Sequence, residues 1–386
     1  MDVMTALRTV TAALACMLLL TPAPFARAAD GDPPFPADYE QRIGAEAAAQ
    51  VEAEYTRYED EEAHARLVAM VNEIAAASGR PDVEYDVRLL DTDEVNAFSL
   101  PGSIIYVTKA LLSAVQSDHE LAGVLAHEIA HNCTYDALVQ ADRNRELFTG
   151  SVAATIAAIL LGAGSDTVST VLLAGEYIRR GVLGGYSVDL ESRADRHAVE
   201  YLLKTSYNPA GLLTFMGRLA AQWRREAQQD PLFPTHPDPG KRVADLAEQL
   251  YDAGVDVNPR ATTQWERPVA EEVEADGQTV AHVVLWGDEI FRVMVPGPDA
   301  ETPLARAEAI VGRLTPLLEA GVQRYELSVG DHDGNPAVGA RGEVILTVYP
   351  EDAQAQGTDQ ATLAGRAEMA LMVALRTEEL NWYWNE

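Results

Sequence analysis

The sequence is poor in positive charge. Its 386 residues include 29 lysines and arginines against 60 aspartates and glutamates, which gives a net charge of −31. Such a chain is repelled by phosphate backbones and by anionic lipid headgroups, so its composition argues against nucleic acid as a partner. The hydrophobic content of 47% is that of a globular protein, and the length allows two domains, each with its own core.

Cysteine is scarce as well. Cys16 and Cys133 are the two in the chain, and the first lies in a segment with the layout of a secretory signal peptide. Arg8 precedes an apolar run, and a small-residue Ala-Arg-Ala pattern occupies positions 26–28. We expect cleavage after this pattern, which would leave one cysteine and no intramolecular disulfide. An uncleaved anchor and a lipidated Cys16 are the alternatives. Export without disulfides fits the periplasm or cell envelope of a bacterium, and we expect the protein there.

Long apolar runs are missing from the rest of the chain. The most apolar segment, residues 152–175, is interrupted by glycines and an aspartate. A membrane-spanning helix needs about 20 consecutive apolar residues. We therefore expect a buried helical hairpin at 152–175, and the alternatives are an apolar flap over a cleft or a peripheral contact with the membrane.

Turn residues and periodicity divide the chain into two parts. Residues 29–255 are predicted to be mainly helical, with short strands at 83–90 and 104–107. The polar stretch 256–275 contains two prolines and is expected to be a linker. Residues 276–386 are predicted to form a small α+β domain in the order strand–strand–helix–strand–strand–helix. The sequence does not indicate what this second domain binds.

One detail of the second domain has two interpretations. The stretch DHDGNP at 331–336 hints at a calcium-binding loop, but Pro336 stands where such a loop needs glycine. We therefore expect a hairpin turn at that point. The flanking segments 325–329 and 344–348 are predicted to be the paired strands.

The strongest functional signal is the stretch SDHELAGVLAHEIAHNCT, which begins at Ser117. Ser117 and Glu120 have the spacing of a capping box, which starts a helix. On that helix His127 and His131 are one turn apart, so both imidazoles can reach one ion, and Glu128 lies beside them. In a His-Glu-x-x-His helix two histidines bind zinc and the glutamate is the general base. The alternative is a helix with two surface histidines.

A catalytic zinc ion needs a third protein ligand and an open fourth position. The segment YSVDLESRADRHAVEYL, predicted to be helical, offers Glu191 as that ligand. Asp195, one turn later, could accept a hydrogen bond from a ligand histidine and so fix its tautomer. A solvent-exposed acidic helix face is the alternative interpretation of these two residues.

These motifs, in this order, resemble the HtpX/CAAX-prenyl-endopeptidase family of zinc metallopeptidases, and in particular its soluble periplasmic, BepA-like branch. The resemblance covers roughly residues 43–250 and is carried by the following stretches: Asn96-Ala97-Phe98, Pro101-Gly102, Ile104 to Val107, ELAGVLAHEIAH, and E-x-x-A-D from Glu191. Arg193 is a departure, because the family often has a second glutamate there. The membrane-spanning helices of the integral members are also missing.

The resemblance implies a mainly α zinc-metallopeptidase (gluzincin) domain with a small β-sheet, followed here by the small α+β domain. It implies one Zn²⁺ per chain held by His127, His131 and Glu191, with Glu128 as the catalytic base.

The resemblance also extends to the segment FPTHPDPGKRVADL, whose His236 corresponds to a residue at the active-site entrance of the family. His236 could donate a hydrogen bond to the oxyanion, could occupy the open position of zinc and keep the enzyme latent, or could have no chemical role. Asn96, Ile104 and Tyr106 are expected to bind substrate, with the strand 104–107 pairing edge to edge with an extended peptide.

Taken together, the sequence predicts an exported zinc-dependent metalloendopeptidase. Its expected partners are unfolded or unassembled envelope proteins, which it would cleave in quality control. Two alternatives remain open. One is a regulatory peptidase with a narrow substrate recognised by the second domain, and the other is a chaperone-like binding protein whose zinc site is latched.

Overall fold

The computed structural model describes most of the chain outside the predicted signal segment and the apolar segment. The described residues are 35, 37–144, 182, 185–226, 239–275, 277–298 and 300–383. Residues 1–28, residues 152–175 and His236 lie outside them, so the expectations for those positions stay predictions. None of the helices in the described ranges is long and apolar enough to cross a membrane.

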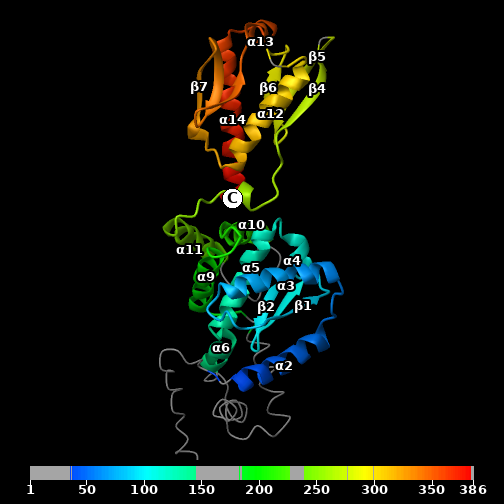
Figure 1. Cartoon of the computed structure of the whole chain (residues 1–386), viewed down its shortest axis with the longest axis vertical. Coiled ribbons are helices and arrows are strands. Elements are labelled where there is room, and N and C mark those ends of the chain that lie inside the picture. The colour runs from blue at the N-terminus through cyan, green and yellow to red at the C-terminus, as the bar shows by residue number, and fades with distance from the viewer. Residues whose placement is uncertain are drawn as a thin grey trace, which may run out of the picture. The chain divides into compact units, whose positions relative to one another are not determined.

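Contacts between residues group the chain into two compact units. Figure 1 labels the helices and strands of the chain. Of the described residues, the first unit contains 35, 37–113, 125–144, 182 and 185–197, and the second contains 114–124, 198–226, 239–275, 277–298 and 300–383. Two helices, α5 (Asp118–Cys133) and α9 (Val188–Leu202), continue from one unit into the other.

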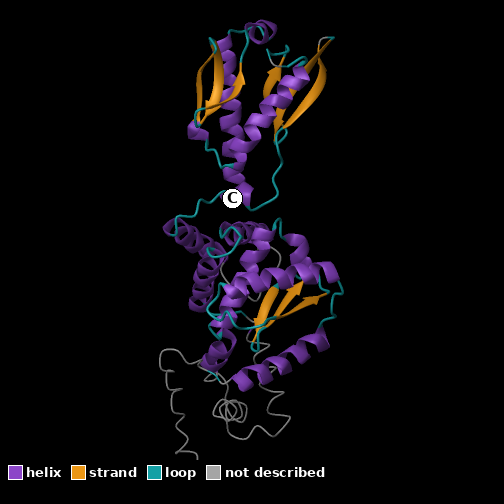
Figure 2. Cartoon of the chain, viewed as in Figure 1, coloured by secondary structure: helices purple, strands orange, loops and turns teal. Residues whose placement is uncertain are grey.

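The first unit contains a three-stranded mixed sheet in the order β1-β3-β2 (Figure 2). Its strands are β1 (Asp86–Leu90), β2 (Ala97–Leu100) and β3 (Ile104–Thr108). The central strand β3 runs parallel to β1 and antiparallel to β2. The strands expected near 83–90 and 104–107 are therefore present, and the four-residue β2 is an addition that the sequence pattern did not reveal.

Helix α2 (Ala37–Glu54) packs against this sheet and its turns, and α3 (Glu61–Ala76) contacts β1. The approach of α2 is close: a Cβ atom added to Gly44 would lie 1.8 Å from the carbonyl oxygen of Pro101. The turn after Pro101 needs left-handed backbone, with φ of +77° at Gly102. The core between α2 and the sheet includes Ile43, Phe98 and Tyr106.

Helix α5 begins where the sequence predicts. The hydroxyl of Ser117 accepts a hydrogen bond from the backbone N–H of Glu120 at 3.2 Å. The reciprocal half of the capping box differs, because the Glu120 carboxylate accepts from the N–H of Gln116 at 2.7 Å and pairs with Arg218. A left-handed residue, Tyr135 (φ +56°), then turns the chain from α5 into α6 (Asp136–Asn144).

The other described elements of the first part of the chain are helical, as predicted. They are α4 (Lys109–Ala114), α9, α10 (Ala210–Glu226), α11 (Pro239–Asp252) and the short 3-10 turn η2 (Pro259–Ala261). In the second unit α10 and α11 pack against each other.

The C-terminal part is an α+β domain, as expected, but with three strands before each helix rather than two. Its elements are β4 (Val269–Ala275), β5 (Gln278–Leu285), β6 (Asp288–Val293), α12 (Pro303–Glu319), η3 (Arg324–Glu326), β7 (Leu327–His332), β8 (Asn335–Ala340), β9 (Glu343–Thr347), α13 (Pro350–Ala355) and α14 (Gln360–Tyr383). They form two antiparallel sheets, β4-β5-β6 and β7-β8-β9. Helices α12 and α14 lie between the sheets and contact both, enclosing one apolar core (Figure 2).

Two expectations for this part need correction. Residues 325–329 and 344–348 do not pair with each other, because β8 lies between β7 and β9 and pairs with both. The stretch 256–275, expected as a linker, contains β4, which pairs with β5 along its whole length. The turn expected at 331–336 is confirmed, with Asp333 and Gly334 both at positive φ between β7 and β8.

Candidate metal centre

Three predicted ligands meet inside the first unit. Helix α5 supplies His127 and His131, and α9 supplies Glu191. Their exposed fractions are 4%, 1% and 0%. One donor atom from each residue lies within 4.8 Å of the others, and this is the group of metal-binding residue types that the described part of the chain brings together. The three residues that the sequence motifs singled out as ligands are therefore close together in the fold.

Each histidine has a carboxylate at its Nδ1 atom. His127 Nδ1 lies 2.9 Å from Asp195 Oδ1, and His131 Nδ1 lies 2.7 Å from Asp136 Oδ2. An imidazole whose Nδ1–H donates to a carboxylate carries its lone pair on Nε2. The two Nε2 atoms face each other at 3.0 Å, and the Glu191 carboxylate lies beside both. With one donor atom from each of the three residues close together, this group is arranged to hold a metal ion.

The spacing of these donor atoms fits zinc. The two Nε2 atoms lie 3.0 Å apart, and the Glu191 carboxylate presents one oxygen to each: Oε2 lies 3.4 Å from His127 Nε2, and Oε1 lies 3.6 Å from His131 Nε2. Tetrahedral zinc with bonds of about 2.0–2.1 Å places its ligand atoms about 3.3–3.4 Å apart. Two imidazoles and one carboxylate are also the donor set of one class of catalytic zinc sites.

The electrostatics of the site favour positive charge. Burial disfavours the protonated form of His131, but its hydrogen bonds to Asp136 and Glu191 outweigh burial and raise its pKa from 6.5 to about 10. Glu128, only 1% exposed, adds its charge to this field. The surrounding carboxylates thus stabilise positive charge at His131.

Tyr186, just before α9, was not among the predicted site residues. Its ring stacks on His131 with centroids 4.1 Å apart and an angle of 24° between the planes. Burial, followed by the charge of Glu128, raises the pKa of the Tyr186 phenol well above 10, so the phenol stays protonated. Both rings line one pocket with Leu100 and Pro101, at the end of β2.

Asp136 was also not predicted as a site residue, although its position in the sequence is close to His131. It lies five residues after His131, and a left-handed turn at Tyr135 brings its carboxylate back to the last turn of α5. Arg193 of α9, noted only as a departure from the family pattern, forms an ion pair with Asp136. Only the folded chain reveals these contacts.

The predicted substrate residues are placed differently from the expectation. Ile104 and Tyr106 lie on β3, the central strand, whose backbone is paired on both sides. The edge pairing expected of residues 104–107 is therefore wrong, because a peptide can add only to an outer strand. Asn96 is half-buried, and its backbone carbonyl accepts a hydrogen bond from the hydroxyl of Thr108.

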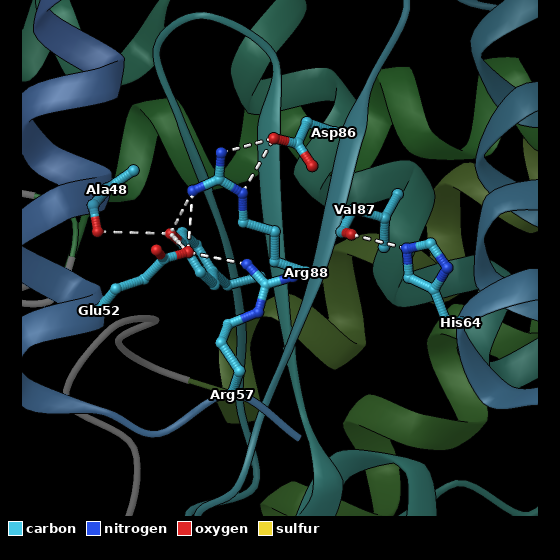
Figure 3. Close-up of polar contacts among 8 residues, drawn as sticks. Ala48, Glu52, Arg57, His64, Asp86, Val87 and Arg88 are labelled. Carbon is cyan, nitrogen blue, oxygen red and sulfur yellow. Dashed lines mark hydrogen bonds and ion pairs between the residues drawn. The ribbon is translucent and has the colours of Figure 1, made fainter. Parts of the chain in front are cut away.

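The Tyr106 side chain is fully buried, and its hydroxyl belongs to a polar network between α2 and the sheet. The phenol oxygen accepts from Arg88 at 3.0 Å and lies 3.2 Å from the Glu52 carboxylate. Figure 3 shows Arg57 and Asp86 completing the network on Glu52 and Arg88. The hydroxyl of Tyr106 is thus engaged within the fold rather than presented to a ligand.

Comparison with known proteins assigns the two parts of the chain separately. Residues 61–250, about half of the chain, match peptidase family M48. Residues 282–378 match a domain of unknown function, DUF8459.

Several curated proteins are similar to the first part. The beta-barrel assembly-enhancing protease of Escherichia coli K12 is 31% identical over 161 residues, which cover 41% of this chain and 32% of that protein. The mitochondrial metalloendopeptidase OMA1 of Schizosaccharomyces pombe is 26% identical over 221 residues, covering 56% of this chain and 63% of its own length. A protease HtpX homolog of Acidiphilium cryptum is 38% identical over 96 residues, which cover 24% of this chain and 29% of that protein. This chain spans about a third of the length of the assembly-enhancing proteases that it matches.

Proposed function

Residues 61–250 belong to peptidase family M48, and on that premise we propose that this protein is a zinc-dependent metalloendopeptidase that holds one Zn²⁺ per chain. His127, His131 and Glu191 are its ligands, and Glu128 is its catalytic base. One observation carries the proposal: the two Nε2 atoms and the Glu191 carboxylate converge in a buried site while both Nδ1 atoms are held by carboxylates.

The division of labour follows from the placement of the residues. Zinc, when bound, supplies Lewis acidity that polarises the scissile carbonyl and acidifies a water molecule. Glu128 follows His127 on α5 and takes the proton of the attacking water, then delivers it to the leaving amine. Asp195 keeps His127 in the tautomer whose lone pair is on Nε2. For His236 we propose the role of hydrogen-bond donor to the developing oxyanion.

We further propose that the substrates are unfolded or unassembled proteins of the bacterial envelope. Two observations support this proposal. The N-terminal segment has the layout of a secretory signal, and relatives at 25–31% identity are named beta-barrel assembly-enhancing proteases. The net charge of −31 also disfavours anionic surfaces as partners.

The test is to produce residues 29–386 and to measure zinc content together with cleavage of casein as an unfolded substrate. Wild type is compared with Glu128→Gln, and Glu62→Gln on the exposed face of α3 serves as the matched control. We expect one zinc per chain in all three proteins and cleavage by all except Glu128→Gln. Absence of zinc from the wild type contradicts the metalloenzyme assignment.

A second outcome separates the alternatives. Zinc binding without cleavage in the wild type would favour the latched state, and His236→Ala should then release activity. Cleavage of casein at many sites supports a quality-control role, whereas resistance of casein combined with cleavage of one envelope protein supports a narrow regulatory substrate.

A further inference from the structure

Asp136 is a fully buried carboxylate that no step of the proposed reaction uses. It is the first residue of α6, its exposed fraction is 0%, and it follows the left-handed Tyr135 that ends the connection from α5. Its Oδ2 atom lies 2.7 Å from His131 Nδ1. Removing a carboxylate from water costs several kcal/mol unless it is paired, so this placement needs compensation.

Arg193 provides that compensation. Its guanidinium pairs with the Oδ1 atom of Asp136, the oxygen that His131 does not use. With a donor on each oxygen, Asp136 acts as an acceptor on both, and His131 Nδ1 must then be the donor. The Arg193 side chain remains 35% exposed while Asp136 is completely buried, so the pair connects the site to the surface of α9.

Helix α9 therefore contributes to both histidines. Glu191 faces both Nε2 atoms, Asp195 holds Nδ1 of His127, and Arg193 acts on His131 through Asp136. The ring plane of His131 is fixed independently by its stack on Tyr186. When Nε2 binds a metal, the remaining proton of His131 must lie on Nδ1, and the carboxylate of Asp136 accepts the hydrogen bond from that position.

We propose that Asp136 and Arg193 form a positioning pair that holds His131 with its Nε2 lone pair directed at the metal. The proposal rests on the proposed function, since it assigns these residues a task in metal binding. An arginine at position 193 thus has a defined role in this chain. It neutralises and orients the carboxylate that orients His131.

The test measures zinc affinity rather than catalysis, by competition of the full chain with a chromophoric chelator. Asp136→Asn can present its amide N–H₂ to Nδ1, which would move the proton of His131 to Nε2. We expect it to weaken zinc binding by about 10–100-fold. Arg193→Ala should weaken binding to a smaller extent, and Arg193→Lys should restore part of the loss. Arg196→Ala, an exposed arginine on the same helix, is the matched control and should leave the affinity unchanged.

Two further measurements distinguish positioning from a general loss of structure. Arg193→Ala added to Asp136→Asn should weaken binding no further, because Arg193 acts through Asp136. The visible spectrum of the Co²⁺-substituted protein should change in Asp136→Asn and Arg193→Ala but not in Arg196→Ala. Additive losses in the double variant, or unchanged spectra, contradict the proposal.

The outcomes also separate this inference from the proposed function. A wild-type chain that binds no zinc overturns both. A wild-type chain that binds zinc, with Arg193→Ala equal to Arg196→Ala in affinity, overturns the positioning pair alone. If Asp136→Asn fails to fold, as judged by far-UV circular dichroism, the zinc affinities of Arg193→Ala and Arg196→Ala test the positioning pair on their own.

Discussion

At the residue scale, the candidate metal centre is shaped by carboxylates other than the expected ligand Glu191. His127 and His131 each donate from Nδ1 to a different carboxylate, Asp195 and Asp136. A histidine without such a partner can carry its proton on either nitrogen, and only one of the two tautomers binds a metal through Nε2.

Asp195 offers the clearest test of this principle, because it is 1% exposed and lies 2.9 Å from His127 Nδ1. Asp195→Asn should weaken zinc binding by about 10–100-fold while the secondary structure persists. The measurement is zinc content after dialysis against a graded series of chelator concentrations. Asp82→Asn, at an exposed position, is the control, and equal retention of zinc by both variants would refute the role of Asp195.

At the scale of elements, helix α2 is built to lie directly on the turn between β2 and β3. Gly44 touches the backbone of Pro101, and a Cβ atom there would approach the carbonyl oxygen to 1.8 Å. Because the obstacle is backbone, Gly44→Ala should destabilise the protein by roughly 1–3 kcal/mol despite the better helix propensity of alanine. Urea denaturation checks this. Gly217→Ala in α10, where nothing lies within 4 Å, should instead be neutral or stabilising.

The same helix is joined to the sheet by Glu52, whose pKa responds to its arginine partners. Burial raises this pKa, but the hydrogen bond from Arg57 and the charge of Arg88 outweigh burial and lower it below 4.5. A carboxyl with a lowered folded-state pKa stabilises the fold above its unfolded pKa, and the contribution is lost as the pH falls through the folded value.

Glu52→Gln should therefore reduce stability at neutral pH by roughly 0.5–1 kcal/mol, a modest effect because the side chain is 35% exposed. The difference from wild type should shrink as the pH falls below about 4.5. Urea titrations at pH 7 and pH 4 measure it, with Glu84→Gln at an exposed position as the control. A difference that is independent of pH would show that packing rather than charge is responsible.

At the scale of the whole molecule, the sequence predicted what local spacing determines. The pairing of His127 with His131, and of Glu191 with Asp195, follows from helical periodicity, since residues three or four apart share a face. That these two pairs meet was expected from the family resemblance. Asp136 and Tyr186 reach His131 only through a turn and the meeting of separate helices, which no short motif encodes. The order of strands is equally non-local, so nothing in residues 104–107 showed that β3 would be central. Strand β4, with the acidic sequence VAEEVEA, resembles a polar linker because it lies at a sheet edge.

The extent of the C-terminal domain follows from these contacts and can be tested directly. A fragment of residues 276–386 would lack β4. It would also lack residues 258–260, which form hydrogen bonds and an ion pair with α12 and α14. In that segment Asn258 donates to the carbonyl of Glu319 at 2.8 Å, and the buried Arg260 forms an ion pair with Glu378.

We expect residues 258–386 to unfold cooperatively in urea, because their apolar core lies within this part of the chain. Residues 276–386 should be destabilised by several kcal/mol or fail to fold, since losing β4 exposes β5 and leaves the Glu378 carboxylate without Arg260. Circular dichroism of the two fragments at matched concentration measures the difference. The stability of the longer fragment with Arg260→Ala should lie between those of the two fragments. Equal stability of both fragments would place the boundary of the domain after β4 instead of before it.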